Sequence, residues 1–295
     1  MSTYSIKDLE HLSGIKAHTL RIWEQRYNFI KPKRTETNIR FYDDHDLKLI
    51  LNVSLLKDNG HKISKIAKMS YNEMQEEVIK FTERDLKYPD KIHSLTLAMI
   101  DLDEDRFEKI MANNILLLGF ENTIINVIYP FMSKIGVLWQ TGSINPAHEH
   151  FITNLVRQKL IVAIDGQFLP KNKAPKKYML FLPEGEYHEI GLLFASYIIR
   201  NRENQVVYLG QSLPFSDLKA VYSLHNPDYL LTLMTTFPIQ EELQNYVDNL
   251  SKEFKQSNLL LAGYQITNNP IKLPENACIL KNITDLIDFV EENGC

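Results

Sequence analysis

The chain has 295 residues, of which 44% are hydrophobic and 24% charged, as is ordinary for a folded globular protein. This length suits two or three compact domains. No apolar run approaches the ~20 residues that a transmembrane helix needs, and the N-terminus lacks the basic and apolar segments of a signal peptide. These features predict a cytoplasmic protein with no membrane partner.

Charge is distributed unevenly along the chain. Residues 1–42 contain eight Lys and Arg against four Asp and Glu, so this segment carries +4 while the whole chain carries −4. The remainder of the chain must therefore carry −8. A basic head on an acidic body predicts that the N-terminal end binds a polyanion.

The N-terminal segment predicts two short helices with a turn between them. A helix is expected over residues 5–13, where a serine cap precedes apolar residues at helical spacing. Gly14 ends it, and a second helix is expected over residues 17–27 with Leu20 and Trp23 facing the core. The outward face of the second helix would then present polar residues to the DNA major groove: His18, Thr19, Arg21, Gln25 and Arg26.

Residues 31–42 place two basic clusters around a polar turn and end in aromatic residues. A small β-wing of this kind would follow the phosphates of DNA. The further contacts expected with DNA are Tyr27, Lys33, Arg34, Arg40 and Tyr42. The two tyrosines could equally lie in the core, and the arginines could instead form surface ion pairs.

The stretch TLRIWEQRYNFIKPKRTETNIRFY resembles the winged helix-turn-helix head of the MerR family of bacterial transcription regulators. The resemblance covers about 70 residues. It implies a non-enzymatic, sequence-specific regulator that binds double-stranded promoter DNA as a homo-dimer or higher homo-oligomer. Residues 71–90 lack the sustained heptads of a dimerisation coiled coil, so later segments would have to mediate assembly.

Residues from about 75 to 166 predict a helical bundle, because apolar residues recur at helical spacing. Examples of this spacing are Ile115, Leu118, Ile125, Ile128 and Ile135.

Near the end of this stretch, Trp139 is followed by Glu149 and His150. The pattern resembles the segment over the upper face of adenosylcobalamin in light-responsive repressors of the CarH/LitR group. The resemblance implies that the tryptophan packs against the adenosyl group and that Glu149 and His150 line its pocket. Gln140 stands where light-sensing relatives carry a histidine that can bind cobalt. An amide is a poorer cobalt ligand, which disfavours a light switch of that type.

The C-terminal part alternates β-rich runs with amphipathic helices. The runs are YMLFL, QVVYLG, DYLLTLM, NLLLAGYQI and ACIL. This alternation predicts a Rossmann-like, flavodoxin-like parallel sheet with helices on both faces. Residues 169–177, rich in Pro and Lys, are the expected linker. We therefore expect a winged helix-turn-helix in residues 1–75, a helical bundle in 76–168 and an α/β domain in 176–295.

Glu186, His188 and Gly191 follow the first predicted strand, at the end of the sheet where open α/β folds bind ligands. They resemble the D/E-x-H-x-x-G signature of cobalamin-binding domains. The resemblance implies that His188 is the lower ligand of cobalt and that Glu186 binds its other ring nitrogen. Gly191 would leave room for the corrin ring.

Two other elements of that family differ here. The third strand lacks the usual serine, and Thr232 or Thr235 could supply the hydroxyl. The usual Gly-Gly of the fourth strand is Ala262-Gly263, followed by Tyr264, which would crowd the nucleotide tail.

The expected cofactor is a cobalamin, adenosylcobalamin by the resemblance, whose binding would change oligomerisation. The alternative is a cofactor-free regulator that uses the α/β domain for dimerisation or protein binding. A corrinoid-carrying enzyme subunit is a further alternative, against which the basic head argues.

Overall fold

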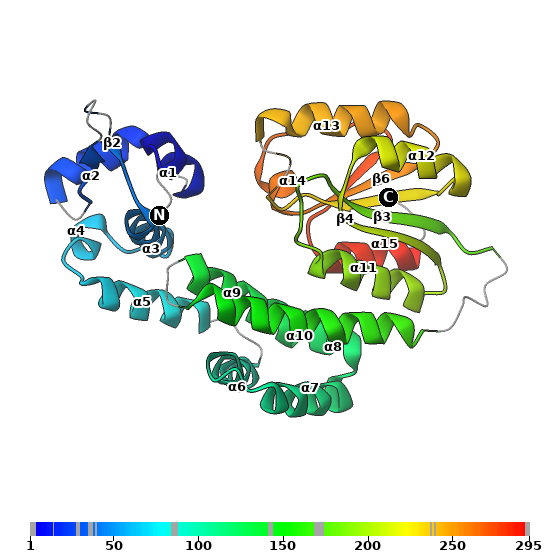
Figure 1. The fold of residues 1–295 in the computed structure, drawn as a ribbon, viewed down its shortest axis with the longest axis horizontal. Helices are drawn as coiled ribbons and strands as arrows, with labels where there is room; N and C mark the ends of the chain where they lie inside the picture. The colour runs from blue at the N-terminus through cyan, green and yellow to red at the C-terminus, as the bar shows by residue number, and fades with distance from the viewer. Residues whose placement is uncertain are drawn as a thin grey trace. The chain divides into compact units, whose positions relative to one another are not determined.

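The structure is a computed structural model, which describes residues 4–13, 15–27, 30–34, 38, 40–83, 88–140, 144–167, 174–236, 238 and 240–292. The chain forms two compact units, residues 1–152 and 153–295, and the division falls within helix α10 (Pro146–Asp165; Figure 1). The expected three-part division remains a prediction, and residues 169–173 of the expected linker lie outside the described residues. Within the described ranges, no helix has both the length and the apolar character needed to cross a membrane.

The first unit begins with a winged helix-turn-helix, as predicted. Its elements are α1 (Ile6–Ser13), α2 (Ala17–Tyr27), β1 (Lys33–Arg34), β2 (Arg40–Phe41), α3 (Asp44–Asp58), α4 (Ile63–Ile66) and α5 (Tyr71–Glu83). Strands β1 and β2 pair in antiparallel fashion. Leu20 and Trp23 are buried in the core of this head, as their helical spacing predicted.

The rest of the first unit is helical, as predicted, with one irregularity. It comprises α6 (Pro89–Ile100), α7 (Glu104–Leu118), α8 (Phe120–Thr123), the π-helix η1 (Ile124–Ile128), α9 (Tyr129–Gln140) and the start of α10. Ile124, Val127 and Ile128 are buried in η1, whereas Ile125 is only half-buried. The wider π turn displaces the simple helical spacing, because each of its hydrogen bonds spans five residues.

The second unit is a five-stranded parallel sheet of order β4-β3-β5-β6-β7. Its strands are β3 (Lys177–Pro183), β4 (Gln205–Leu213), β5 (Tyr229–Leu233), β6 (Asn258–Ala262) and β7 (Ala277–Leu280). Its helices are α11 (Ile190–Asn201), α12 (Phe215–His225), α13 (Gln240–Glu253), α14 (Tyr264–Asn268) and α15 (Ile283–Glu292). This order confirms the predicted flavodoxin-like fold.

The run NLLLAGYQI contains the fourth strand and the start of the next helix. Strand β6 ends at Ala262, and Gly263, with a φ of 101°, leads directly into helix α14. A positive φ breaks the extended backbone, so a continuous apolar run becomes two elements.

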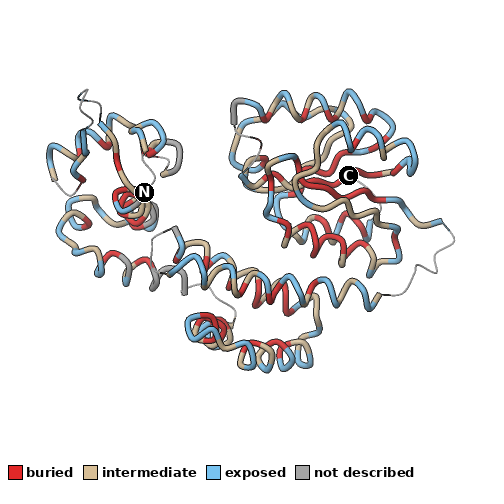
Figure 2. Tube along the Cα trace, viewed as in Figure 1, coloured by how far each residue is buried: buried red, intermediate tan, exposed pale blue. Residues whose placement is uncertain are grey.

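Helices α12 and α13 cover one face of the sheet, and α11 and α15 cover the other (Figure 1). The interior strand β3 is buried from Tyr178 to Pro183 (Figure 2). Met179 and Phe181 contribute to the core beneath α12 and α13. Burial on both faces explains why this strand reads as an unbroken apolar run rather than an alternating one.

Candidate functional site

Polar contacts fix the turn between the two helices of the head. Ser5 and Asp8 form a capping box at the start of α1, in which the Ser5 amide donates to Asp8 Oδ2 at 2.6 Å and the Asp8 amide donates to Ser5 Oγ at 3.3 Å. Glu10 Oε2 accepts from the Ala17 amide at 3.0 Å and so caps the start of α2. Because a side chain of α1 satisfies the first turn of α2, the two helices hold a fixed angle.

The outward face of α2 carries the predicted DNA-contacting residues. His18, Arg21, Gln25 and Arg26 are exposed and Thr19 is half-buried. Tyr27 is partly buried against the head core, with the Arg26 guanidinium 5.6 Å from its ring centroid.

Tyr42 lies in the core instead of on this surface. It is 1% exposed, and its hydroxyl donates to Glu24. Burial, together with this carboxylate neighbour, raises the pKa of Tyr42 well above its usual range. Its surroundings therefore argue for a structural role rather than for contact with DNA.

Three basic residues of the wing, those expected to contact DNA, differ in their surroundings. Arg40 on β2 is exposed. Arg34 donates to the backbone and side-chain oxygens of Asn38, at 3.3 and 2.7 Å, and so braces the turn. Lys33 forms an ion pair with Asp43. The geometry leaves Arg40 as the wing cation whose surroundings best suit phosphate contact.

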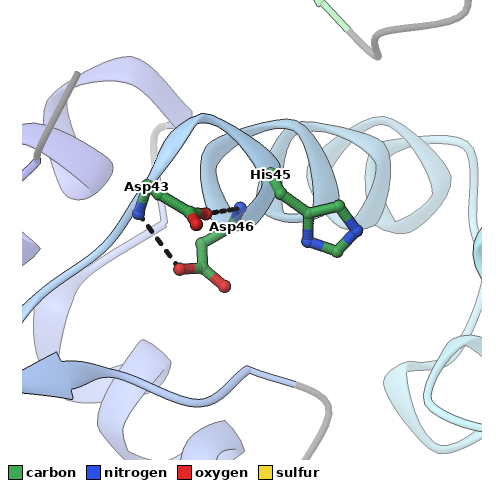
Figure 3. A group of neighbouring side chains, drawn as sticks. All are labelled: Asp43, His45 and Asp46. Carbon is green, nitrogen blue, oxygen red and sulfur yellow. Dashed lines mark hydrogen bonds between the residues drawn. The ribbon is translucent and has the colours of Figure 1, made fainter. Parts of the chain in front are cut away.

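Asp43, His45 and Asp46 lie together at the start of α3 (Figure 3). The Asp43 amide donates to Asp46 Oδ2 at 3.1 Å, and the Asp46 amide donates to Asp43 Oδ1 at 3.0 Å. The hydrogen bond from Lys33 lowers the pKa of Asp43 to about 2, whereas burial raises the pKa of Asp46. These contacts explain the two carboxylates as a helix cap.

The predicted upper-face residues lie on α9 and α10. Trp139 is 50% exposed, which is unusual for so large an apolar side chain. Glu149 is half-buried and His150 exposed, with His150 Nδ1 3.7 Å from Glu149 Oε2. Asn145 Oδ1 accepts from the Ala147 amide at 2.9 Å and so places both residues in the first turn of α10.

In the second unit, the loop between β3 and α11 holds an imidazole and a buried carboxylate together. His188 Nδ1 lies 2.5 Å from Glu186 Oε1. The Glu186 side chain is fully buried, while that of His188 is 60% exposed. A carboxylate can only accept, so Nδ1 carries the proton, and in the neutral imidazole the lone pair is therefore on Nε2. This is the tautomer that a metal-ligating imidazole requires.

Backbone donors from two loops also hold Glu186. Oε1 accepts from the amides of Tyr187 and His188 at 3.0 and 3.1 Å. Oε2 accepts from the amides of Thr235 and Thr236 at 2.8 and 2.7 Å. These two threonines follow β5, which pairs with β3 at the point where the strand order reverses. The carboxylate thus links the two loops that flank the usual ligand crevice of this fold.

The remaining predicted residues have structural neighbours of their own. A Cβ on Gly191 would lie 2.6 Å from Leu233 Cδ2, and one on Gly263 would lie 2.5 Å from the Met234 carbonyl oxygen. Both glycines therefore meet a close approach within the protein. Thr232 is 1% exposed, and its Oγ1 has no hydrogen-bond partner among the described residues.

Sequence reasoning missed a second carboxylate network beside His188. Glu189 is 8% exposed and accepts from Arg157 Nε of α10 at 2.5 Å, from the Tyr208 hydroxyl at 3.1 Å and from Gln211 at 3.4 Å. Burial and the Glu189 charge raise the pKa of Tyr208, which keeps its hydroxyl a donor. Sequence spacing gave no signal for these contacts, because the three donors lie on two other elements.

Comparisons with known proteins find matches to two separate parts of the chain. Residues 4–73 match the MerR HTH family of regulatory proteins, and residues 91–163 match a B12 binding domain. The HTH-type transcriptional repressor CarH of Myxococcus xanthus is 28% identical over 77% of this chain and 77% of its own length. The repressor CarA of the same organism is 23% identical over 84% of this chain and 82% of its own.

One solved structure shares the fold. The monomethylamine corrinoid protein of Methanosarcina barkeri superimposes with a TM-score of 0.53 at 13% identity, covering 70% of this chain and 99% of that one. The chain thus combines a MerR-type head with a B12-binding module and is homologous to the CarH and CarA repressors.

Proposed function

We propose that this homologue of MerR-type repressors is a DNA-binding transcription regulator, not an enzyme, whose parallel-sheet domain binds a cobalamin as a signal. The single observation that carries the cobalamin proposal is the His188–Glu186 pair. Its exposed Nε2 and its fully buried carboxylate fit a cobalt-ligating imidazole.

The donor set around Glu186 supports this role physically. Four backbone amides, the Thr236 hydroxyl and one imidazole N–H surround the carboxylate, so the ring is held in one orientation and one tautomer. When bound, a cobalamin would supply a cobalt ion that an imidazole nitrogen can bind and a visible chromophore. His188 would bind the cobalt through Nε2, while Glu186 would keep the ring from turning.

Other predicted residues have proposed roles of their own. The role of Trp139, Glu149 and His150 beside an adenosyl group, which the resemblance to the CarH/LitR group implies, stays a prediction. In the sheet domain, the buried hydroxyl of Thr232 without a partner is a candidate donor to the cofactor tail.

The test is a visible absorption titration of the purified protein with adenosylcobalamin in the dark. Wild-type protein should bind stoichiometrically and show the spectrum of imidazole-ligated cobalt. His188→Ala should lose that spectrum, whereas His225→Ala, which truncates an exposed histidine at the end of α12, should retain it. Wild-type protein that retains no adenosylcobalamin through gel filtration would refute the cobalamin proposal and leave the MerR assignment intact.

DNA binding is proposed to use the exposed face of α2 and the wing. Arg21→Ala and Arg40→Ala should each weaken binding to a selected duplex and reduce its salt dependence, because each removes a phosphate or base contact. Arg106→Ala on α7 removes the same charge far along the chain and is the control. Wild-type affinity in both head variants would refute these assignments.

We further propose that the protein acts as a homo-dimer or higher oligomer and that cobalamin changes this assembly. A ligand favours whichever assembly binds it more tightly. Sedimentation with and without adenosylcobalamin should therefore give different masses, and His188→Ala should abolish the difference. Equal masses would refute regulated assembly.

One observation favours the cofactor-free alternative. Close contacts within the protein already account for Gly191 and Gly263, so these glycines do not require a corrin or a tail. A colourless protein that binds no added cobalamin, but whose oligomeric mass changes when the sheet domain is mutated, would favour an α/β domain used for assembly.

A further inference from the structure

The exposed face of α2 carries one large aliphatic side chain that the head core does not use. Ile22 is 51% exposed, whereas Leu20 and Trp23 on the same helix are 1% and 6% exposed. Its neighbours one helical turn away are His18 and Arg26, both exposed. Ile22 is therefore an apolar position on a cationic surface.

Packing within the head does not account for this isoleucine. β-branched residues are not the best helix formers, and a half-exposed one gains only part of the transfer energy of burial. The core of the head instead contains Leu20 and Trp23.

The surrounding charges indicate what could cover Ile22. Arg21 and Arg26 flank it on a helix that presents its exposed face to a polyanion in the proposed function. In the major groove, the apolar feature of a base edge is the 5-methyl group of thymine. The branched aliphatic side chain of Ile22 could therefore contact a thymine methyl group, while the cations on either side of it contact phosphates.

We propose that Ile22 contacts a thymine 5-methyl group in each half of the DNA site and so determines specificity there. This inference rests on the proposed DNA-binding function. The residue reads one methyl group, while the arginines around it supply most of the affinity.

The test replaces thymine by deoxyuridine, which removes the methyl group and keeps the base-pairing atoms. The full-length protein is first used to select a duplex from a random library, and each thymine of that duplex is then replaced in turn. At one position in each half-site, wild-type protein should bind about fourfold more weakly to the uracil duplex, as expected for the loss of one buried methyl group.

Ile22→Ala should bind the thymine and uracil duplexes equally at that position, which closes a double-mutant cycle between the side chain and the methyl group. Leu116→Ala, which truncates an 84% exposed aliphatic side chain on α7, is the matched control and should keep the fourfold difference. Urea unfolding followed by tryptophan fluorescence should give the same midpoint for Ile22→Ala and wild type.

The outcomes separate this inference from the function on which it rests. If no duplex is enriched, the DNA-binding proposal fails and the inference fails with it. If a duplex is enriched but uracil weakens wild type and Ile22→Ala equally, only the thymine contact is refuted. Loss of the uracil effect in Ile22→Ala alone supports the contact.

Discussion

Glu186→Gln should destabilise the sheet domain far more than its small change in shape suggests. Both oxygens of Glu186 face donors: Oε1 accepts from two backbone amides and His188 Nδ1, Oε2 accepts from two further backbone amides, and the Thr236 hydroxyl lies 3.3 Å from each oxygen. The NH2 group of a glutamine must replace one of these oxygens. In either orientation it meets two backbone N–H groups, which can only donate.

The cost follows from those two lost partners. A hydrogen bond to a charged acceptor contributes about 1.5–3 kcal/mol, so the variant should lose about 3–6 kcal/mol of unfolding free energy, less whatever the loops regain by shifting. His188→Ala removes one donor from a 60% exposed ring and leaves the four backbone amides in place. It should cost about 1 kcal/mol or less, because water can replace the ring.

Urea unfolding can distinguish these values within one protein. Both tryptophans, Trp23 and Trp139, lie in residues 1–152, so their fluorescence follows the first unit and not the sheet domain. Far-UV circular dichroism follows both units. Glu186→Gln should shift the dichroism transition of the sheet domain and leave the fluorescence transition unchanged. A shift no larger than that of His188→Ala would refute the donor-network reasoning.

Three other predictions concern stability. Asp43→Asn should keep the helix cap but lose the ion pair with the β1 lysine. Because the pKa of Asp43 is lowered to about 2, the stabilisation that this ion pair gives is present above pH 4 and lost toward pH 2. The difference in unfolding free energy between wild type and variant, followed by tryptophan fluorescence, should therefore vanish over that range. Gly263→Ala should prevent stable folding of the sheet domain, since its Cβ would contact backbone atoms at a position with positive φ. In Gly191→Ala the new Cβ contacts only the end of a leucine side chain, so this variant should lose about 1–2 kcal/mol of unfolding free energy, measured by circular dichroism. Arg157→Met should cost about 1–2 kcal/mol by leaving the nearly buried Glu189 to its two neutral donors, and unchanged hydrogen exchange in α11 would count against that view.

The features predicted correctly depend on short stretches of chain. The two helices of the head follow from caps and apolar spacing within residues 5–27, and the strands follow from apolar runs bounded by turns. The His188–Glu186 hydrogen bond was implied by the resemblance to the D/E-x-H-x-x-G signature, whose two residues are separated by one position in one loop. In each case the partners lie within about one element, so the sequence pattern contains the whole geometry.

The features that were missed depend on packing between distant segments. The amides of Thr235 and Thr236 reach Glu186 from another loop, and any residue type except proline would supply them. Tyr42 was expected on DNA or in the core, and its burial depends on Glu24 from α2. The π turn in η1 is defined by its pattern of backbone hydrogen bonds, which the spacing of apolar residues does not predict.

The cost of the Glu186 arrangement is itself an argument for a ligand at His188. A fully buried carboxylate is expensive to desolvate, and apolar side chains of similar volume would hold two loops together at least as well. The one property that an apolar replacement could not supply is an exposed imidazole fixed in a single tautomer with Nε2 available. Gly191 of the motif and Gly263 after the fourth strand support no such conclusion, because Leu233 and Met234 already require them. Among the residues of the motif, the buried acid is therefore the one whose energetic cost favours the proposed binding site.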